Sequence, residues 1–308
     1  MYLCPILVLM DYLNNQISTA FKRLDGAYAP NTIRSYYADV AQFVDWCGEK
    51  SVPAFPLDDK VLVDFIGAHQ FTLKYATVRR KLAALRKINS LLGCPDVAHS
   101  QEFHLALRRM RRGQSAERWQ ARGINEDLLL RMIAAQPRTL TGTRNRALLS
   151  LGYDFLARRS ELTALEVGDI KFSEGGGLRA VICRSKADQF GRGRLVYGSQ
   201  RSAKHLRAWL KCLPEGGGLI FRAVGGDKVL GRPLCGRSVS NIVKLSVVKA
   251  RGQRPRECEV SGHSLRVGAA QDLLIRGHDI SAIMRAGGWD SLRVLSNYPR
   301  LTEHNIWE

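Results

Sequence analysis

Acidic side chains are scarce in this sequence relative to basic ones. Its 308 residues hold 28 Asp and Glu against 47 Lys and Arg, a formal net charge of +19. A folded chain with this balance is typical of proteins that bind a polyanion, most often nucleic acid, and a generally basic soluble protein is the alternative. The excess is spread along the chain, with 17 basic and 11 acidic residues up to Gly123 and 30 and 17 after it.

Cysteine motifs and long apolar runs are also missing. The seven cysteines are scattered, without a C-x-x-C motif or a Cys/His cluster. We therefore expect reduced thiols, no structural zinc and a cytoplasmic protein. The apolar start "MYLCPILVLM" lacks a basic n-region and contains Pro5, so it is too short for a membrane span and a poor signal peptide.

Nucleotide-binding loops and internal repeats are absent from the sequence. The triple glycines at 175–177 and 216–218 are not followed by the Lys and Ser/Thr of a phosphate-binding loop, so we interpret them as turns. We accordingly expect no metal and no ATP or other cofactor.

The first third of the chain has helical patterning. Helices are predicted at 31–47, behind a capping Asn31 or Thr32, and at 76–92. The apolar stripe of the first comprises Ile33, Tyr37, Val40, Val44 and Cys47. The polar surface of the second, either a solvated face or a phosphate-binding one, comprises Arg79, Arg80, Lys81, Arg86 and Lys87.

A basic segment separates this part from the rest. Periodicity is lost over residues 108–123, which carry six arginines and two glycines. We place a helical DNA-binding domain at 1–113, a basic linker at 114–123 and a second domain at 124–308. The charge of the linker indicates either additional phosphate contacts or simple solvation.

The second domain combines helices and strands. Short β-rich runs at 178–183 and 194–197, bounded by glycine turns, predict a small antiparallel sheet. The predicted helices span 125–135, 143–155, 159–166, 200–213, 238–250, 263–276 and 279–286.

The stretch "SGHSLR" carries the first candidate for chemistry. With Ser261 or Gly262 as cap, His263 and Arg266 fall in the first turn of a helix and share one face. Free N–H groups and a guanidinium there favour an anion such as phosphate. Taken alone, such a pair is more often an ordinary polar helix start.

A tyrosine follows at a suggestive distance. Two glycines allow a sharp turn before Trp289, and a short helix at 291–297 then leads to Tyr298. A tyrosine hydroxyl can attack phosphorus and hold a covalent intermediate, although a single tyrosine is usually structural. The interpretation therefore rests on the whole set of residues.

Upstream residues complete this set. The segment "ARRSEL" contains Arg158, Arg159 and Glu161, and Lys186 lies in the turn between the two predicted strands. The chain thus resembles the tyrosine recombinases, or phage integrases, and most closely the simple Cre-like members. That family has an R-x-S/A-E-L/I box, a hairpin lysine, an H-x-x-R box, a G-G-H/W position and a nucleophilic tyrosine nine residues later. In chain order, the matching residues are Arg158, Glu161, Lys186, His263, Arg266, Trp289 and Tyr298.

The resemblance implies a fold and an assembly. The expected fold is an α-helical N-terminal core-binding domain, a SAM-like bundle, with a mixed α+β catalytic domain of the DNA breaking-rejoining type, mostly α with a small antiparallel sheet. The implied partner is double-stranded DNA with inverted-repeat half-sites, bound by a homotetramer in the nucleoid, with accessory DNA-bending proteins not excluded.

The resemblance also assigns roles around the nucleophile. Tyr298 attacks a phosphodiester, forms a 3′-phosphotyrosyl link and expels a 5′-hydroxyl, which Lys186 protonates. His263 assists Tyr298 as base or hydrogen-bond partner. Trp289 packs against the site or donates its indole N–H.

The remaining roles concern negative charge. Arg158 and Arg266 hold the nonbridging oxygens, and Glu161 steadies them from behind. Strand exchange through a four-way junction is the implied function. The alternatives are a telomere resolvase, a type IB topoisomerase and a catalytically inactive DNA-binding regulator.

Further arginines and lysines are candidates for DNA contact. One of them, Arg237, resembles the Cre position whose arginine enters the major groove, and an ordinary surface arginine is the alternative. The full set comprises Arg34, Arg79, Arg80, Lys81, Arg108, Arg111, Arg112, Arg118 and Arg237.

Overall fold

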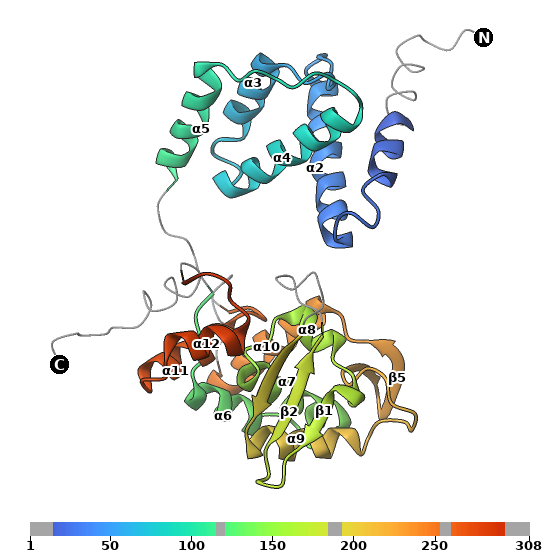
Figure 1. Ribbon diagram of the computed structural model, residues 1–308, viewed down its shortest axis with the longest axis vertical. Helices are drawn as coiled ribbons and strands as arrows, with labels where there is room; N and C mark the ends of the chain where they lie inside the picture. The colour runs from blue at the N-terminus through green and yellow to red at the C-terminus, as the bar shows by residue number, and fades with distance from the viewer. Residues whose placement is uncertain (1–14, 115–120, 184–192, 253–259, 293–308) are drawn as a thin grey trace, which may run out of the picture. The chain divides into compact units, whose positions relative to one another are not determined.

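The computed structural model (Figure 1) divides into two compact units, Met1–Arg118 and Trp119–Glu308. It describes residues 15–114, 121–183, 193–252 and 260–292. No helix among these residues is long and apolar enough to cross a membrane.

The N-terminal unit is helical in its described residues. After a helical segment at 15–22, its helices are α2 (Pro30–Glu49), α3 (Asp59–His69), α4 (Tyr75–Leu91) and α5 (Gln101–Gly113). Their apolar faces meet in one core, where Phe43 contacts Phe65 edge to face at 5.2 Å between ring centroids. Each fully buried side chain of this size contributes about 1.5–3 kcal/mol to folding.

Helix α2 confirms the first predicted helix and corrects its details. The helix begins one residue earlier, behind Ala29 and with Pro30 in its first turn, and Asn31 or Thr32 does not cap it. Val40 and Cys47 are buried as expected, but Tyr37 is 58% exposed. When the apolar stripe of a helix is wide, the residues at the edges of the stripe remain exposed to solvent.

The segment 108–123, in which the sequence shows no periodicity, begins as helix. Ser100 caps α5 by accepting the N–H of Phe103, and the helix continues through the arginines to Gly113. Met110 is buried between those arginines. One buried side chain among four charged ones is too sparse a pattern to read as helical periodicity.

The C-terminal unit surrounds a central helix. This helix, α7 (Leu140–Asp154), is buried along most of its length and contributes to two cores. One core lies between α7 and four helices: α6 (Glu126–Ala134), α10 (Gly236–Arg251), α11 (Ser264–Ile275) and α12 (Ile280–Gly287). The other lies between α7, α8 (Arg159–Ala164), α9 (Gln200–Leu210) and the sheet.

The described strands form two antiparallel sheets. The predicted pair, β2 (Leu178–Ile182) and β3 (Arg194–Gly198), is confirmed, with Ala180 opposite Val196. A short strand, β1 (Ile170–Phe172), extends this sheet in the order β1-β2-β3. A second sheet, β4 (Arg222–Gly225) with β5 (Lys228–Pro233), was not predicted, because none of its strand residues is buried and the strands lack alternating patterning.

Candidate functional site

Arg158 is fixed at the start of α8 by two acceptors. Its guanidinium donates to Glu161 Oε1 at 2.7 Å and to the carbonyl oxygen of Gly288 at 2.8 Å. Glu161 also accepts the backbone N–H of Arg158 at 2.9 Å. The Glu161 side chain is fully buried, whereas 21% of the Arg158 side chain is exposed. Arg158 is therefore held in place by Glu161 and Gly288, with part of its side chain still exposed to solvent.

Arg194, which the sequence analysis did not select, completes this arrangement. As the first residue of β3, it donates to Glu161 Oε2 at 2.5 Å and to the carbonyl oxygens of Phe155, at 3.2 Å, and Ala286. Burial would raise the pKa of Glu161, but the charges of Arg194 and Arg158 lower it below its ordinary value. Glu161 is thus a carboxylate shared between two arginines.

Arg266 is buried on the first turn of α11. Only 1% of the residue is exposed. Its Nη1 donates to the carbonyl oxygens of Leu156, at 2.5 Å, and Gly287, at 2.6 Å. The guanidinium carbon lies 3.8 Å from the ring centroid of Trp289, which gives a cation–π contact. Leu156 adopts a φ of +47°, a left-handed conformation that costs about 1–3 kcal/mol and is characteristic of functional sites.

The turn predicted at the two glycines brings these arginines together. Gly288 ends α12 with a φ of +63°. A Cβ atom on Gly287 would lie 1.9 Å from the ring of Trp289, so no larger residue fits there. Arg266 donates to the carbonyl of Gly287 and Arg158 to that of Gly288. Consecutive peptide groups therefore anchor both guanidinium groups.

His263 lies at the N-cap of α11, whereas Ser261 or Gly262 was the predicted cap. Its backbone N–H donates to Ser261 Oγ at 3.1 Å. Desolvation and the positive charges of Arg266, Arg158 and Arg159 lower the pKa of His263 to about 4. The residue is exposed to solvent, and nearby positive charges lower the pKa of an exposed imidazole because they disfavour its protonated form. The imidazole is therefore neutral near pH 7.

The described part of the site is suited to stabilising negative charge. Two fixed guanidinium groups place positive charge at this turn, and a neutral imidazole can accept a proton. Lys186 and Tyr298 lie outside the described residues. The predicted residues that the structure brings together are Arg158, Glu161, His263, Arg266 and Trp289. Within the described ranges, no cluster of His, Cys, Asp and Glu could hold a metal ion.

Comparison with known proteins agrees with this geometry. A sequence model of the phage integrase family matches residues 123–305, more than half of the chain. The chain belongs to the phage integrase family of tyrosine recombinases. An integrase/recombinase XerD homolog from Selenomonas ruminantium is 29% identical over 94% of this chain and 86% of that protein. Recombinase Cre from Escherichia phage P1 is 25% identical over 89% of this chain and 85% of that protein.

Solved structures of site-specific recombinases share the fold. The XerH recombinase bound to its difH substrate in a pre-cleavage complex gives a TM-score of 0.65 at 17% identity, covering 96% of this chain and 89% of that one. A lambda integrase dimer bound to a core site gives a TM-score of 0.55 at 16% identity, covering 100% of this chain and 84% of that one. The expected helical bundle with a mixed catalytic domain is thus the fold of the chain.

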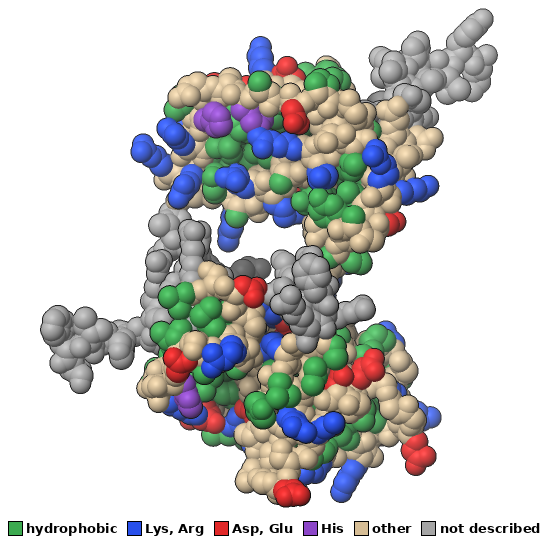
Figure 2. All heavy atoms as spheres, viewed as in Figure 1, with side chains coloured by type: hydrophobic (Ala, Val, Ile, Leu, Met, Phe, Trp, Pro, Cys, Tyr) green, Lys and Arg blue, Asp and Glu red, His purple; other side chains and the backbone are tan. Residues whose placement is uncertain are grey.

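The structure separates the candidate DNA contacts of this family member into several groups. Lysine and arginine side chains spread over the visible face of the N-terminal unit (Figure 2). Arg118 lies outside the described residues, and Arg80 is 45% exposed but bonded to Asp39 at 2.5 Å. The predicted contacts with exposed side chains are Arg34, Arg79, Arg108, Arg111, Arg112 and Arg237.

The prediction that Lys81 belongs to the polar surface is wrong. Only 4% of its side chain is exposed, and Nζ lies 3.1 Å from Asp39 Oδ1 and donates to Gln42. The pair joins α4 to α2 inside the bundle. A buried lysine is tolerated because its charge is paired there, which a count of charges along one helix does not reveal.

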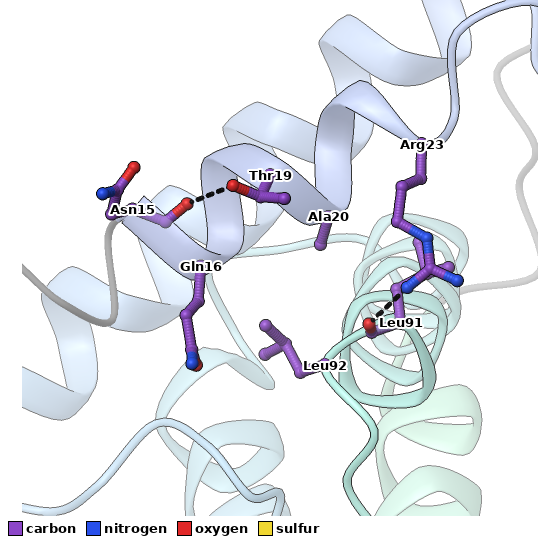
Figure 3. A pocket seen from close by; sticks show the side chains of 7 residues that line it. All are labelled: Asn15, Gln16, Thr19, Ala20, Arg23, Leu91 and Leu92. Carbon is purple, nitrogen blue, oxygen red and sulfur yellow. Dashed lines mark hydrogen bonds between the residues drawn. The ribbon is translucent and has the colours of Figure 1, made fainter.

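A pocket in the N-terminal unit lies apart from these residues (Figure 3). It has a volume of about 280 Å³ and lies between the helical segment 15–22 and the end of α4. Arg23 crosses one side and donates to the carbonyl of Leu91 at 2.9 Å. Asn15 and Thr19 make its rim polar. None of the predicted catalytic residues lines it, so we do not assign the site to it.

Proposed function

We propose that this family member is a site-specific recombinase that cleaves and rejoins DNA through a covalent bond to Tyr298. One observation carries the proposal: the fixed guanidinium groups of Arg158 and Arg266 are anchored on consecutive carbonyl groups, those of Gly288 and Gly287. This turn is the segment from which the chain continues towards Tyr298. A pair of arginines anchored close in sequence to a tyrosine nucleophile suits phosphoryl transfer.

In the proposed reaction, the phenolic oxygen of Tyr298 attacks phosphorus and the bond to the 5′-oxygen breaks. Lys186 gives a proton to that oxygen, and His263 accepts the hydrogen bond or proton of the phenol. A histidine with a pKa of about 4 is a weak base. Bound phosphate offsets the charges of the neighbouring arginines and so raises the pKa of His263 towards its ordinary value.

Arg158 and Arg266 stabilise the charge that develops on the phosphorane. Their planar forks match two nonbridging oxygens, and their fixed positions need no reorganisation during the reaction. Glu161 keeps Arg158 in this position. The 3′-phosphotyrosyl intermediate conserves the energy of the broken bond, so rejoining needs no nucleotide cofactor.

The same proposal covers partners and domain roles. We assign residues 1–113 to core binding, 114–123 to the linker and 124–308 to catalysis. Double-stranded DNA with inverted half-sites is the substrate, and two dimers on two sites form a tetramer that exchanges strands through a four-way junction. Exposed arginines of α4 and α5, such as Arg79 and Arg108, supply salt-dependent phosphate contacts.

A nicked suicide substrate tests the proposal. Duplexes that the protein retains from a random-sequence library supply the target site, which is then prepared with a nick near the expected cleavage position. We expect a covalent protein–DNA adduct from the wild type and none from Tyr298→Phe. Binding without an adduct contradicts the proposal and favours a regulator, whereas relaxation of supercoiled DNA of arbitrary sequence favours a topoisomerase.

A further inference from the structure

Arg159 is the cation beside the site to which the proposed reaction gives no role. It begins α8 directly after Arg158, and its Nη1 donates to Ser240 Oγ on α10 at 3.0 Å. A Cβ atom on Gly262 would lie 2.6 Å from Cδ and 2.7 Å from Cγ of Arg159. The stem of the arginine therefore occupies the space that the glycine leaves free.

The stem of Arg159 lies in a cradle formed by two other elements of the unit. Arg159 comes from α8, Ser240 from the first turns of α10 and Gly262 from the loop before α11. A Cβ atom on Gly236, the first residue of α10, would lie 3.9 Å from Cβ of Arg159. An exposed arginine usually samples many rotamers, so a cradle of this kind directs its guanidinium in advance.

The charge of Arg159 is not balanced by a carboxylate in the residues that the structure describes. The residue is exposed, and the ion pairs of the described chain do not include it. Its charge contributes to the lowered pKa of His263, together with those of Arg266 and Arg158. Arg158 is paired with Glu161, whereas Arg159 adds a positive charge beside it that no described carboxylate balances, which favours an anionic ligand.

We propose that Arg159 binds a backbone phosphate of the DNA strand next to the phosphate held by Arg158 and Arg266. The inference rests on the proposed function. Arg158 and Arg266 converge on the 287–288 turn, whereas Arg159 is directed towards Ser240, so it serves a different phosphate. Ser240 lies three residues after Arg237 and shares its face of α10. This contact therefore ties the proposed base-reading helix to the backbone beside the scissile bond.

Salt-dependent binding tests the contact. The probe is the library-selected duplex, and every variant carries Tyr298→Phe so that no covalent adduct forms. Losing one phosphate contact lowers the slope of log affinity against log salt by about 0.9. For Arg159→Gln we expect that change and about tenfold weaker binding near 0.1 M salt. Arg159→Lys, which keeps the charge, should retain the slope.

Two control variants separate this role from a structural one. Arg131→Gln removes an exposed arginine that is already paired with Asp127 at 2.7 Å, and it should leave the slope unchanged. Ser240→Ala removes the tether and leaves the charge, so it should keep the slope with at most a small loss of affinity. If Arg159→Gln keeps the wild-type slope and only lowers the melting temperature, Arg159 merely joins α8 to α10 and the inference is overturned.

The outcomes also distinguish this inference from the proposed function. Binding of the duplex does not require cleavage, so the salt slope can be measured even if wild-type protein forms no adduct. An absent adduct with a reduced slope in Arg159→Gln would reject the recombinase and keep the phosphate contact. An adduct together with an unchanged slope in Arg159→Gln would keep the recombinase and reject the phosphate contact.

Discussion

Replacing Arg194 by methionine should destabilise the catalytic unit, because the buried carboxylate of Glu161 loses one of its two cations. Arg194 is 11% exposed and bonded to the fully buried Glu161. The substitution removes one of the two cations that hold this carboxylate and leaves the carbonyl groups of Phe155 and Ala286 without their donor. Methionine keeps the length and apolar character of the stem, so a large cavity is avoided.

The expected loss follows from the burial of the pair. Removing one partner of a buried ion pair costs about 3–5 kcal/mol, because the other charge stays desolvated. In a domain of 150–250 residues, this corresponds to roughly 6–20 °C in melting temperature. Arg179→Met, an exposed arginine on the neighbouring strand β2, is the matched control and should change stability by less than about 0.5 kcal/mol.

Urea unfolding of four proteins gives the coupling between the partners. The proteins are wild type, Arg194→Met, Glu161→Gln and the double variant. Because the double variant removes both buried charges of this pair and leaves only the partly exposed Arg158 without its carboxylate, it should be more stable than the sum of the single losses predicts, by about 1–3 kcal/mol. Additive losses within experimental error would refute the argument that Glu161 and Arg194 act as one ion pair.

The pH dependence supplies an independent check. In the wild type, the pKa of Glu161 lies below its ordinary value. Its contribution to stability is therefore present above the unfolded-state pKa of about 4.3 and is lost as the pH falls through the folded-state pKa. Without Arg194, burial shifts the folded-state pKa upwards. The acid loss of stability should then begin at a higher pH in Arg194→Met.

Three further predictions concern other parts of the chain. Gly287→Ala should displace the Trp289 ring, since its Cβ would lie 1.9 Å from that ring, and lower the melting temperature and adduct formation together. NMR titration of free protein should find His263 neutral down to about pH 5, given its pKa of about 4, and a value near 6.5 contradicts this. Asp39→Asn should destabilise the N-terminal unit by about 3 kcal/mol through the buried Lys81, whereas an unchanged urea midpoint would show that the lysine relaxes to solvent.

Much of the fold and the site could be predicted because the relevant signals are local. Helix α2 and the strands β2 and β3 follow from side-chain periodicity over a few turns or residues. The pairing of His263 with Arg266 follows from helical spacing, and the turn at Gly287 from the two glycines. These features depend on residues that are close together in the sequence.

The features that could not be predicted depend on contacts between distant segments. Arg194 and Glu161 are 33 positions apart, and the arginine resembles any exposed arginine at the start of a strand. Lys81 lies within a run of surface bases, and only Asp39 on another helix explains its burial. The strained backbone of Leu156 likewise serves a carbonyl acceptor for Arg266, 110 positions later. Periodicity contains no information on such pairs.

The turn at residues 287–288 has a consequence for how this enzyme can be controlled. Two neighbouring peptide carbonyls accept hydrogen bonds from Arg158 and Arg266. A tilt of this one segment would therefore displace both guanidinium groups. The same segment leads the polypeptide on to the tyrosine. In the proposed reaction the attacking Tyr298 lies ten positions after Gly288, so a ligand or partner that moved this turn would act on the cation pair close in sequence to the nucleophile.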